Sequence, residues 1–211
     1  MKTPMISIII PMYNEENNIE ACIESLRSQT SQNFHVVFID DGSTDDTLKN
    51  LKNSLKNKTI RFAYNILTQS NSGAAKARKT GISATNTPYI LPVDCDDTLS
   101  NNAIFEIEKS IKKHNFPDMS LLDLKIEDEN GVFQNFVYFC PDEILPPSKC
   151  LEFSLGCWKV HGLACTKKEV FIKSLNFYNQ VNPSDTNYWN NDEIITRLNF
   201  FFSNLIVRNE G

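Results

Sequence analysis

Short apolar runs alternate with amphipathic segments through the first half of this 211-residue chain. The apolar runs are rich in β-branched and aromatic side chains, which predicts buried strands, and the segments between them carry apolar residues at helical spacing. The expected strands are residues 6–10, 34–39, 60–67 and 89–93. Three helices are expected between them: the first carries Ile19, Cys22, Ile23 and Leu26 on its apolar face, the second carries Leu48, Leu51 and Leu55, and the third includes residues 74–78. This alternation predicts right-handed βαβ crossovers and a Rossmann-like three-layer α/β/α sandwich with a mainly parallel central sheet.

Polar residues mark the expected starts of the first two helices. Asn14, Glu15 and Glu16 open the first helix. Ser43 and Asp46 have the spacing of a capping box ahead of the second helix, and Asp45 is assigned to capping there as well.

The pattern changes after residue 98. Residues 119–125 and 132–139 are expected to form two strands of a hairpin, because Glu129-Asn130-Gly131 between them contains a turn dipeptide. Further elements are expected as helices at 102–113, 148–155, 168–175 and 191–200 and as strands at 160–166 and 204–211. The last strand stops abruptly, so this sequence is expected to be a piece of a longer protein, truncated at the C-terminus.

Composition and charge exclude several classes of protein. Hydrophobic residues make up 41% and charged residues 22% of the chain, as in ordinary globular domains. A net charge of −5, without any run of Lys or Arg, argues against nucleic-acid binding. The sequence contains neither G-x-G-x-x-G after the first strand nor a P-loop, so a nucleotide would have to be held without a glycine-rich phosphate turn.

The cysteines and the N-terminus indicate a reducing compartment. Six cysteines show no C-x-x-C pair and no zinc-finger spacing, which favours reduced thiols packed as small core residues. Residues 1–5 lead into a strand without a secretory apolar segment, and no apolar run is long enough to cross a membrane. We therefore expect a cytoplasmic protein, with peripheral association at the inner face of the membrane left open.

Two acidic loops carry the main chemical signal, and each follows an expected strand. Asp40 and Asp41 follow the strand 34–39, and Asp94, Asp96 and Asp97 follow the strand 89–93. In open α/β sheets, ligands bind beyond the carboxyl ends of the strands. Crowded carboxylates usually hold a cation, and Mg²⁺ prefers one or two of them together with substrate phosphates. A phosphorylated ligand bound through a divalent ion is therefore expected.

Four ordered motifs resemble those of family 2 glycosyltransferases with the GT-A fold. They are Ser7–Glu16, Asp40–Asp45, Asn71-Ser-Gly73 with Ala77-Arg78, and Asp94-Cys-Asp96-Asp97. The resemblance implies inverting transfer of a sugar from a nucleotide donor, usually uridine-based, by a metal-dependent hexosyltransferase. It divides the chain into a nucleotide-sugar half at 1–98 and an acceptor-side half at 99–211 with a small antiparallel region.

The resemblance also implies roles for individual residues. Pro11 and Tyr13 would pack around the base, and Asp41 would accept a hydrogen bond from the uracil ring. Arg78 would lie near the nucleotide and the acidic motif. Asp96 would coordinate Mn²⁺ or Mg²⁺, while Asp94 would hold the ribose or assist the metal. The remaining residues assigned to the donor site are Glu15, Asp40, Gly73 and Lys76, of which Lys76 equally fits an exposed helix face.

The catalytic base is expected in the second half. Asn191-Asp192-Glu193 resembles the family's Glu-Asp segment on a helix, which assigns the base to Asp192, or to Glu193 if the register shifts by one. Asn191 replaces the usual Glu, and Lys79 stands where Asn is common. The Gln-x-x-Arg-Trp signature of processive members is missing, which favours addition of one sugar in surface-glycan synthesis, with a glycan or lipid-linked acceptor.

Other interpretations of the same residues remain open at this point. Pro11 could simply end a strand, Asp40 and Asp41 could form a turn, and Asp192 could complement a helix dipole. The segment Tyr89–Leu99 also resembles the haloacid-dehalogenase phosphatase signature, in which Asp94 would be the nucleophile and Asp96 the acid/base. A catalytically inactive nucleotide-sugar-binding module is the third possibility.

Overall fold

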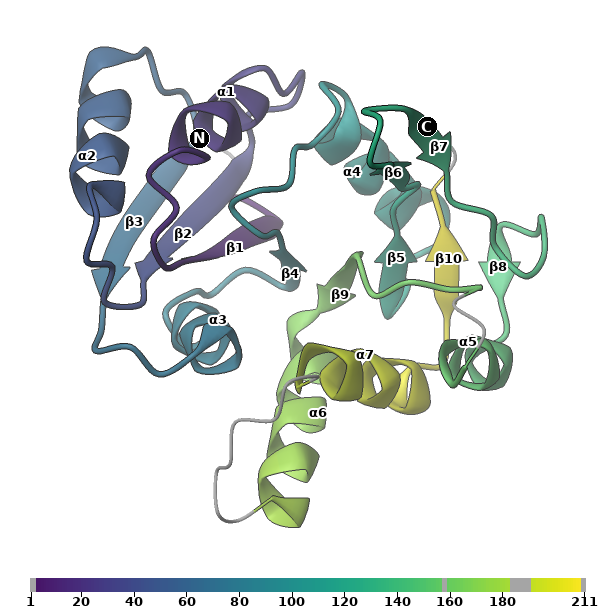
Figure 1. Cartoon of the computed structure of the whole chain (residues 1–211). Coiled ribbons are helices and arrows are strands. Elements are labelled where there is room, and N and C mark those ends of the chain that lie inside the picture. Colours follow the sequence, from purple (N-terminus) through teal and green to yellow (C-terminus); the bar gives the residue numbers. More distant parts are fainter. Residues whose placement is uncertain (1–2, 157–158, 183–190, 210–211) are drawn as a thin grey trace. The chain divides into compact units, whose positions relative to one another are not determined.

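The computed structural model describes residues 3–156, 159–182 and 191–209, and of residues 191 and 192 it describes the backbone alone. The chain divides into two compact units, residues 1–105 and 106–211. Each unit contains strands covered by helices, and each is described by itself (Figure 1).

The first unit is built on four parallel strands in the order β3-β2-β1-β4. All seven residues of β1 are buried, so this strand is central and covered on both faces. Its Ile6 is level with Phe34 of β2 and with Tyr89 of β4. The strands are β1 (Ile6–Met12), β2 (Phe34–Asp40), β3 (Ala63–Thr68) and β4 (Tyr89–Pro92).

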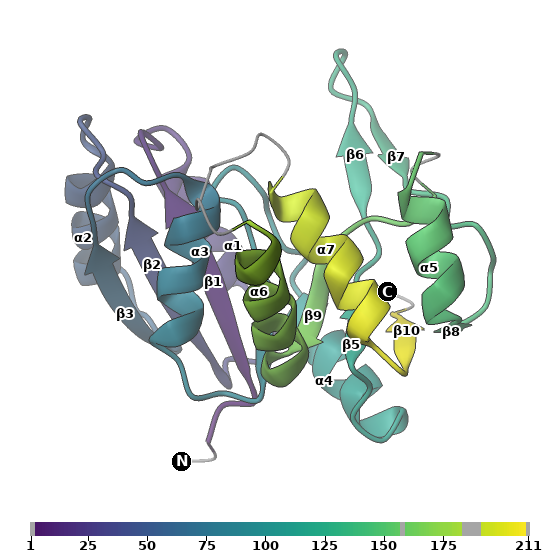
Figure 2. The same cartoon turned by 90° about the horizontal axis from the view of Figure 1, so that it is seen from below.

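Three helices complete the layers of the first unit. α1 (Ile19–Arg27) and α2 (Thr47–Asn57) lie on one face of the strands, and α3 (Ala74–Ser83) lies on the other (Figures 1 and 2). α1 buries Ile19, Cys22, Ile23 and Leu26, the apolar positions on which the helix was predicted. The three-layer α/β arrangement with a mainly parallel sheet is thus confirmed.

The predicted starts of the first two helices were partly wrong. α1 begins at Ile19, after a turn over residues 14–18. Ser43 and Asp46 form no capping box, because Ser43 Oγ accepts a hydrogen bond from the Asn14 N–H and the Asp46 N–H donates to Glu16. Asp45 does meet the start of α2, where its Oδ1 accepts the N–H of Thr47 at 3.0 Å.

The second unit contains a mixed sheet and a separate hairpin. The sheet has the order β9-β5-β10-β8, in which β5 and β10 are parallel and the two outer pairs are antiparallel. α6 and α7 lie on one face of it, and α4 lies on the other (Figures 1 and 2). The elements are α4 (Ala103–Lys113), β5 (Met119–Leu121), β6 (Lys125–Glu127), β7 (Phe133–Asn135), β8 (Ile144–Leu145), α5 (Pro147–Ser154), β9 (Ala164–Lys167), α6 (Lys168–Val181), α7 (Asn191–Phe202) and β10 (Ile206–Arg208).

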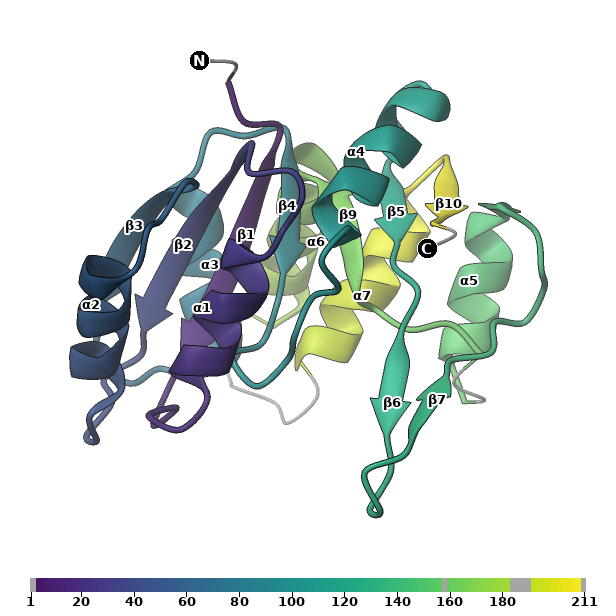
Figure 3. The ribbon, with the colours of Figure 1, turned by 90° about the horizontal axis from the view of Figure 1, so that it is seen from above.

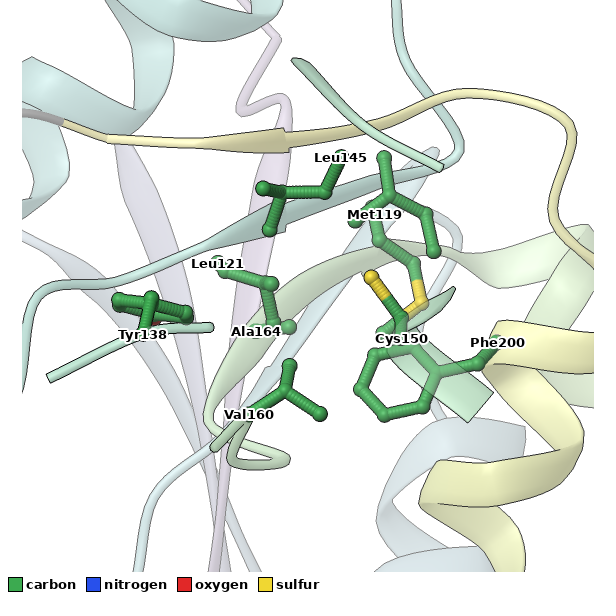
Figure 4. Packing of buried hydrophobic residues seen from close by; sticks show 9 residues of the cluster. Met119, Leu121, Tyr138, Leu145, Cys150, Val160, Ala164 and Phe200 are labelled. Carbon is green, nitrogen blue, oxygen red and sulfur yellow. The ribbon is translucent and has the colours of Figure 1, made fainter. Parts of the chain in front are cut away.

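The core of the second unit joins the sheet to α5 and α7. Met119 and Leu121 of β5 pack with Cys150 of α5 and Phe200 of α7, all of them without solvent exposure (Figure 4). Burial of four such side chains supplies several kcal/mol of hydrophobic stabilisation, at about 1.5–3 kcal/mol for each large one. α7 is therefore held firmly along its C-terminal half.

The hairpin prediction was wrong in its strand boundaries. The pairing 119–125 with 132–139 is replaced by a shorter hairpin of β6 and β7, which projects beyond the sheet of its unit (Figure 3). β5 instead lies inside the sheet of the second unit, where it pairs with β9 and β10 and all three of its residues are buried. The predicted strand 119–125 therefore supplies β5 to the sheet and only its last residue, Lys125, to the hairpin.

Two further sequence expectations concern cysteines and membranes. The five cysteines within the described residues are free thiols, and four of them are buried, as expected for core residues. Cys157 lies outside the described residues. In the described part of the chain, every helix is too short or too polar to cross a bilayer.

Candidate functional site

Strand order places the site at the carboxyl ends of β1, β2 and β4. From β1 the chain moves outward through β2 to β3, and it then returns to the opposite side of β1 as β4. The order of strands thus reverses between β1 and β4, and such switch points open a crevice at the carboxyl ends of parallel strands. Tyr13, Asp40, Asp41 and Asp94 each lie at or directly after one of these ends.

The segments after β1 and β2 hold each other in place. Asn14 adopts a left-handed backbone with φ of 57°, a conformation that Asn tolerates better than most residues. Its N–H donates to Ser43 Oγ at 3.1 Å, and its Oδ1 accepts the N–H of Thr44 at 2.8 Å. The Glu15 N–H donates to Thr47 Oγ1 at 2.7 Å. The first acidic loop is therefore fixed to the segment that carries Tyr13.

Asp41 is buried, and its carboxylate organises the loop of residues 69–73. Only 2% of the residue is exposed. Its Oδ1 accepts from Gln69 Nε2 at 2.7 Å, and its Oδ2 accepts from the Gly73 N–H at 2.7 Å. The Ser72 N–H is shared between the two oxygens at 3.0 and 3.2 Å. Three N–H donors thus compensate a buried negative charge that has no cationic partner among the described residues.

A glycine allows the 69–73 loop to approach this closely. Gly42 has φ of +76°, and a Cβ there would lie 2.8 Å from the backbone nitrogen of Asn71. The Gln69 N–H donates to the Asp40 carbonyl at 3.0 Å, next to this contact. Asp40 itself is 5% exposed, and its Oδ1 accepts the Ser43 N–H at 3.2 Å. Asp40 and Gly42 therefore shape the backbone around Asp41.

The second acidic loop, residues 94–97, is joined to α3 by an ion pair. Arg78 Nη2 donates to Asp94 Oδ1 at 2.6 Å, and the arginine side chain is mostly buried. The Asp97 N–H bonds to the Asp94 carbonyl at 3.1 Å, which closes a tight turn. Arg78 therefore balances one of the three carboxylates of the loop and sets the position of the loop against α3.

The other two carboxylates of the acidic loop carry uncompensated charge. Asp96 and Asp97 are exposed, and their carboxylates have no hydrogen-bond or ion-pair partner within the described part of the chain. Partial burial, with the negative charges of Asp94 and Asp96, raises the pKa of Asp97 above its usual value. A cation at this loop would relieve that repulsion.

The loop fits a divalent ion that is completed by a ligand. Among residues 3–156, 159–182 and 191–209, no three Asp, Glu, His or Cys side chains form a ready-made metal cluster. Mg²⁺ seldom needs one, because one or two carboxylates plus substrate phosphates commonly bind it. Asp96, together with Asp94, supplies oxygen ligands of that kind.

Cys95 has a structural place beneath the acidic loop. It is buried against Cys22 of α1. The contact with the Cys22 thiol, together with burial, raises the pKa of Cys95 far above its ordinary value. A thiol that stays protonated is a poor nucleophile. Cys95 thus anchors the loop between its two aspartates.

The remaining residues assigned to the donor site take varied positions. Pro11 is buried within β1, level with Ile39, whereas Tyr13 is 46% exposed just beyond the strand. Glu15 Oε2 accepts from Asn18 Nδ2 at 2.7 Å, so part of its role is to brace the turn before α1. Lys76 is partly exposed in the first turns of α3.

The expected base lies at the start of α7. The helix begins at Asn191, so Asp192 occupies its first turn, and the side chain of Asp192 lies outside what the structure describes. Glu193, the alternative, pairs with Arg197 one helical turn later at 3.0 Å. Arg197 also donates to the Ser154 carbonyl at 3.1 Å, which ties α7 to α5.

Sequence reasoning missed Gln69 and Thr80. Gln69 donates to Asp41 and accepts the Thr80 hydroxyl at 2.7 Å, so it joins the 69–73 loop to α3. A glutamine in a polar loop carries no recognisable pattern of its own. Its position two residues before the Asn71-Ser-Gly73 motif was the one signal available.

A family model and several known proteins match this chain. The model described as "Glycosyl transferase family 2" matches residues 7–134. The glycosyltransferase GlyG of Streptococcus pneumoniae is 25% identical over 98% of this chain and 69% of its own length. A poly(ribitol-phosphate) beta-glucosyltransferase of Bacillus spizizenii is 32% identical over 77% of this chain, but over only 26% of its own length.

Solved structures match over nearly the whole chain. The crystal structure of residues 1–349 of TarS from S. aureus has a TM-score of 0.74 and 20% sequence identity, over 96% of this chain and 57% of that one. The same protein has been solved with UDP and with UDP-GlcNAc. This chain therefore spans little more than half of the 1–349 fragment and 34% of the longer TarS chain that has also been solved, and the likeness in structure establishes the fold.

Proposed function

Since the chain belongs to glycosyl transferase family 2, we propose that it transfers a single sugar from a UDP-sugar donor to an acceptor hydroxyl with inversion. One observation carries this proposal. The strand order brings the buried carboxylate of Asp41 and the exposed acidic loop of residues 94–97 to the same end of one sheet, where they would hold the base and a cation. The predicted family is confirmed by the family model, whereas the phosphatase interpretation explains neither Asp41 nor Tyr13.

Residues at the carboxyl ends of β1 and β2 support the proposed binding of the nucleotide base. Tyr13 offers an exposed ring on which a base can stack, beyond the buried Pro11. Two carboxylate oxygens have about four acceptor positions. Three N–H donors make four contacts with Asp41, two at each oxygen. The ring N–H of uracil would take the place of the longest of them, the Ser72 contact at 3.2 Å to Oδ2. The TarS complexes with UDP and UDP-GlcNAc support a uridine donor.

The acidic loop of residues 94–97 supports the proposed binding of the donor diphosphate through a metal ion. Asp96, with Asp94, would hold Mn²⁺ or Mg²⁺, which stabilises negative charge on a departing diphosphate. Arg78 holds Asp94 in position through the bond at 2.6 Å. A phosphorylated donor could otherwise approach this loop only against the repulsion of its carboxylates.

Asp192 is the residue that we assign as the general base. It would take the proton from the acceptor hydroxyl as that oxygen attacks the anomeric carbon, a contribution of about 10²–10⁴-fold. Glu193 is the weaker candidate, because taking a proton would cost it the pairing with Arg197.

The acceptor that we propose is a cell-surface glycan or polymer, or a lipid-linked precursor of one. A poly(ribitol-phosphate) beta-glucosyltransferase among the relatives supports this class of acceptor. Residues 106–211 would supply the acceptor surface, and residues 1–105 the donor site.

A UDP-release screen across donor sugars tests the proposal. Release should require both a divalent ion and an acceptor, and it should be lost in Asp192→Asn. Hydrolysis of an aryl phosphate without any nucleotide would instead establish a phosphatase. Binding of UDP without turnover of any donor would point to an inactive nucleotide-sugar-binding module.

A further inference from the structure

The side chain of Gln69 links the carboxylate of Asp41 to helix α3. Resting on the proposed function, we propose that Gln69, held by Thr80, is a positioning residue for recognition of the nucleotide base. Gln69 would not touch the base. It would act by fixing the orientation of the Asp41 carboxylate that the base contacts.

Both ends of the Gln69 amide have partners that fix its orientation. Nε2 donates to Asp41 Oδ1 at 2.7 Å, and Oε1 accepts from Thr80 Oγ1 at 2.7 Å. The hydroxyl of Thr80 can donate, whereas an ionised carboxylate can only accept. A flip of the amide would turn Oε1 toward the Asp41 carboxylate, so the bond to Asp41 would be replaced by repulsion between two acceptors.

Gln69 contributes the one side-chain donor among the three donors to Asp41. The other two donors are the backbone N–H groups of Ser72 and Gly73, whose positions follow the path of the loop. Loss of Gln69 would leave Oδ1 with only the shared bond from Ser72 at 3.0 Å. The carboxylate could then rotate, and the orientation of its two oxygens toward the base would no longer be fixed.

Thr80 attaches this arrangement to a packed helix. It lies within α3, two residues after Arg78, and α3 packs on β1 and β2. The link from Thr80 through Gln69 thus sets Asp41 relative to the same helix that positions the acidic loop through Arg78. Thr80→Val would remove the hydroxyl while keeping the shape of the side chain.

Base discrimination separates a positioning role from a purely structural one. Uracil presents a ring N–H to a carboxylate, whereas cytosine presents a ring nitrogen that accepts and is repelled. A directed Asp41 should therefore favour UDP over CDP, since sites that pair a ligand N–H reject analogues lacking it. General destabilisation would weaken binding of both nucleotides alike.

The experiment is calorimetric titration with UDP and with CDP in Mn²⁺, on wild type, Gln69→Leu, Thr80→Val and Thr68→Val. Thr68 is an exposed residue of β3 next to Gln69, so Thr68→Val is the matched control. Gln69→Leu and Thr80→Val should each lose about tenfold in UDP affinity with little change for CDP, and Thr68→Val should match wild type. If Gln69→Leu does not fold, Thr80→Val alone decides.

An unchanged UDP-to-CDP preference in both variants would overturn the positioning role, whether the two affinities stay at the wild-type values or fall equally. Either result leaves the proposed function intact, provided that wild type binds UDP and transfers sugar. A wild-type protein that binds no UDP would instead overturn the proposed function, and the positioning role with it.

Discussion

Arg78 Nη2 lies 2.6 Å from Asp94 Oδ1, so helix α3 and the acidic loop after β4 are joined by a charge-assisted hydrogen bond. Asp96 and Asp97, the other carboxylates of the loop, have no such partner within the described residues. The loop is thus held in place at one aspartate and keeps free charge at the others, as a ligand-completed cation site requires.

Arg78→Gln should weaken UDP binding in Mn²⁺ by about tenfold, because Asp94 would lose its cationic partner and the loop its attachment to α3. Isothermal titration calorimetry measures this directly. Lys79→Gln is the control, since Lys79 is the next residue of α3 and is exposed. Equal losses in the two variants would indicate that only net charge matters.

Asp192→Asn should abolish sugar transfer while leaving UDP affinity close to that of wild type. The loss should reach about 10²–10⁴-fold, the range expected for a general base. Glu193→Gln should have a smaller effect, because that carboxylate is occupied by Arg197. Wild-type turnover in Asp192→Asn, together with loss of turnover in Glu193→Gln, would assign the general base to Glu193 instead.

Asp118→Asn should destabilise the second unit at neutral pH by about 2 kcal/mol, the scale of hydrogen bonds to a charged group. Burial opposes ionisation of Asp118, but Lys167 and the N–H groups of Asn204 and Leu205 outweigh it and lower the pKa of this carboxyl. Its stabilisation is complete above the ordinary pKa of 3.8 and is lost as the pH falls through the lowered value.

Urea unfolding of wild type and Asp118→Asn between pH 2.5 and 7 tests that dependence. The two stability curves should converge at the acidic end and separate at neutral pH. Asp142→Asn, at an exposed position, serves as the control. Curves that stay parallel throughout would show that the charge of Asp118 is not involved.

His161 should make the protein less stable as the pH falls from 6.5 towards 4. Burial lowers the pKa of His161 to about 4, and its Nε2 lies 2.6 Å from the Tyr138 hydroxyl. The unfolded chain binds a proton in this range and the folded chain does not, so unfolding is favoured by about 3 kcal/mol over the whole interval. His161→Gln should flatten the curve between pH 4.5 and 7 in chemical denaturation. An unchanged slope would contradict a neutral buried histidine.

The strands of the first unit could be predicted from sequence because their signal is local. Ile6–Met12 and Phe34–Asp40 are short, apolar and buried on both faces, and such runs have few alternatives. The order of the acidic motifs then placed them at one sheet edge. The order of the motifs along the chain was sufficient to show the resemblance to a family.

The contacts of Asp41 could not be predicted, because they depend on how a loop folds. Nothing in the sequence shows that residues 69–73 bring three N–H donors to one carboxylate, or that Gly42 makes room for them. The predicted pairing of 119–125 was wrong for the same reason, because β5 (Met119–Leu121) pairs with distant strands and only Lys125 lies in the hairpin. By contrast, the pair Glu193–Arg197 has helical i, i+4 spacing and was visible in the sequence.

The most direct test of a metal-assisted UDP-sugar site is calorimetric titration of wild type and Asp96→Asn with UDP, each in Mn²⁺ and in EDTA. Wild type should bind UDP at least tenfold more tightly in Mn²⁺, and Asp96→Asn should lose that difference. Equal UDP affinity of the wild type in Mn²⁺ and in EDTA would contradict the account.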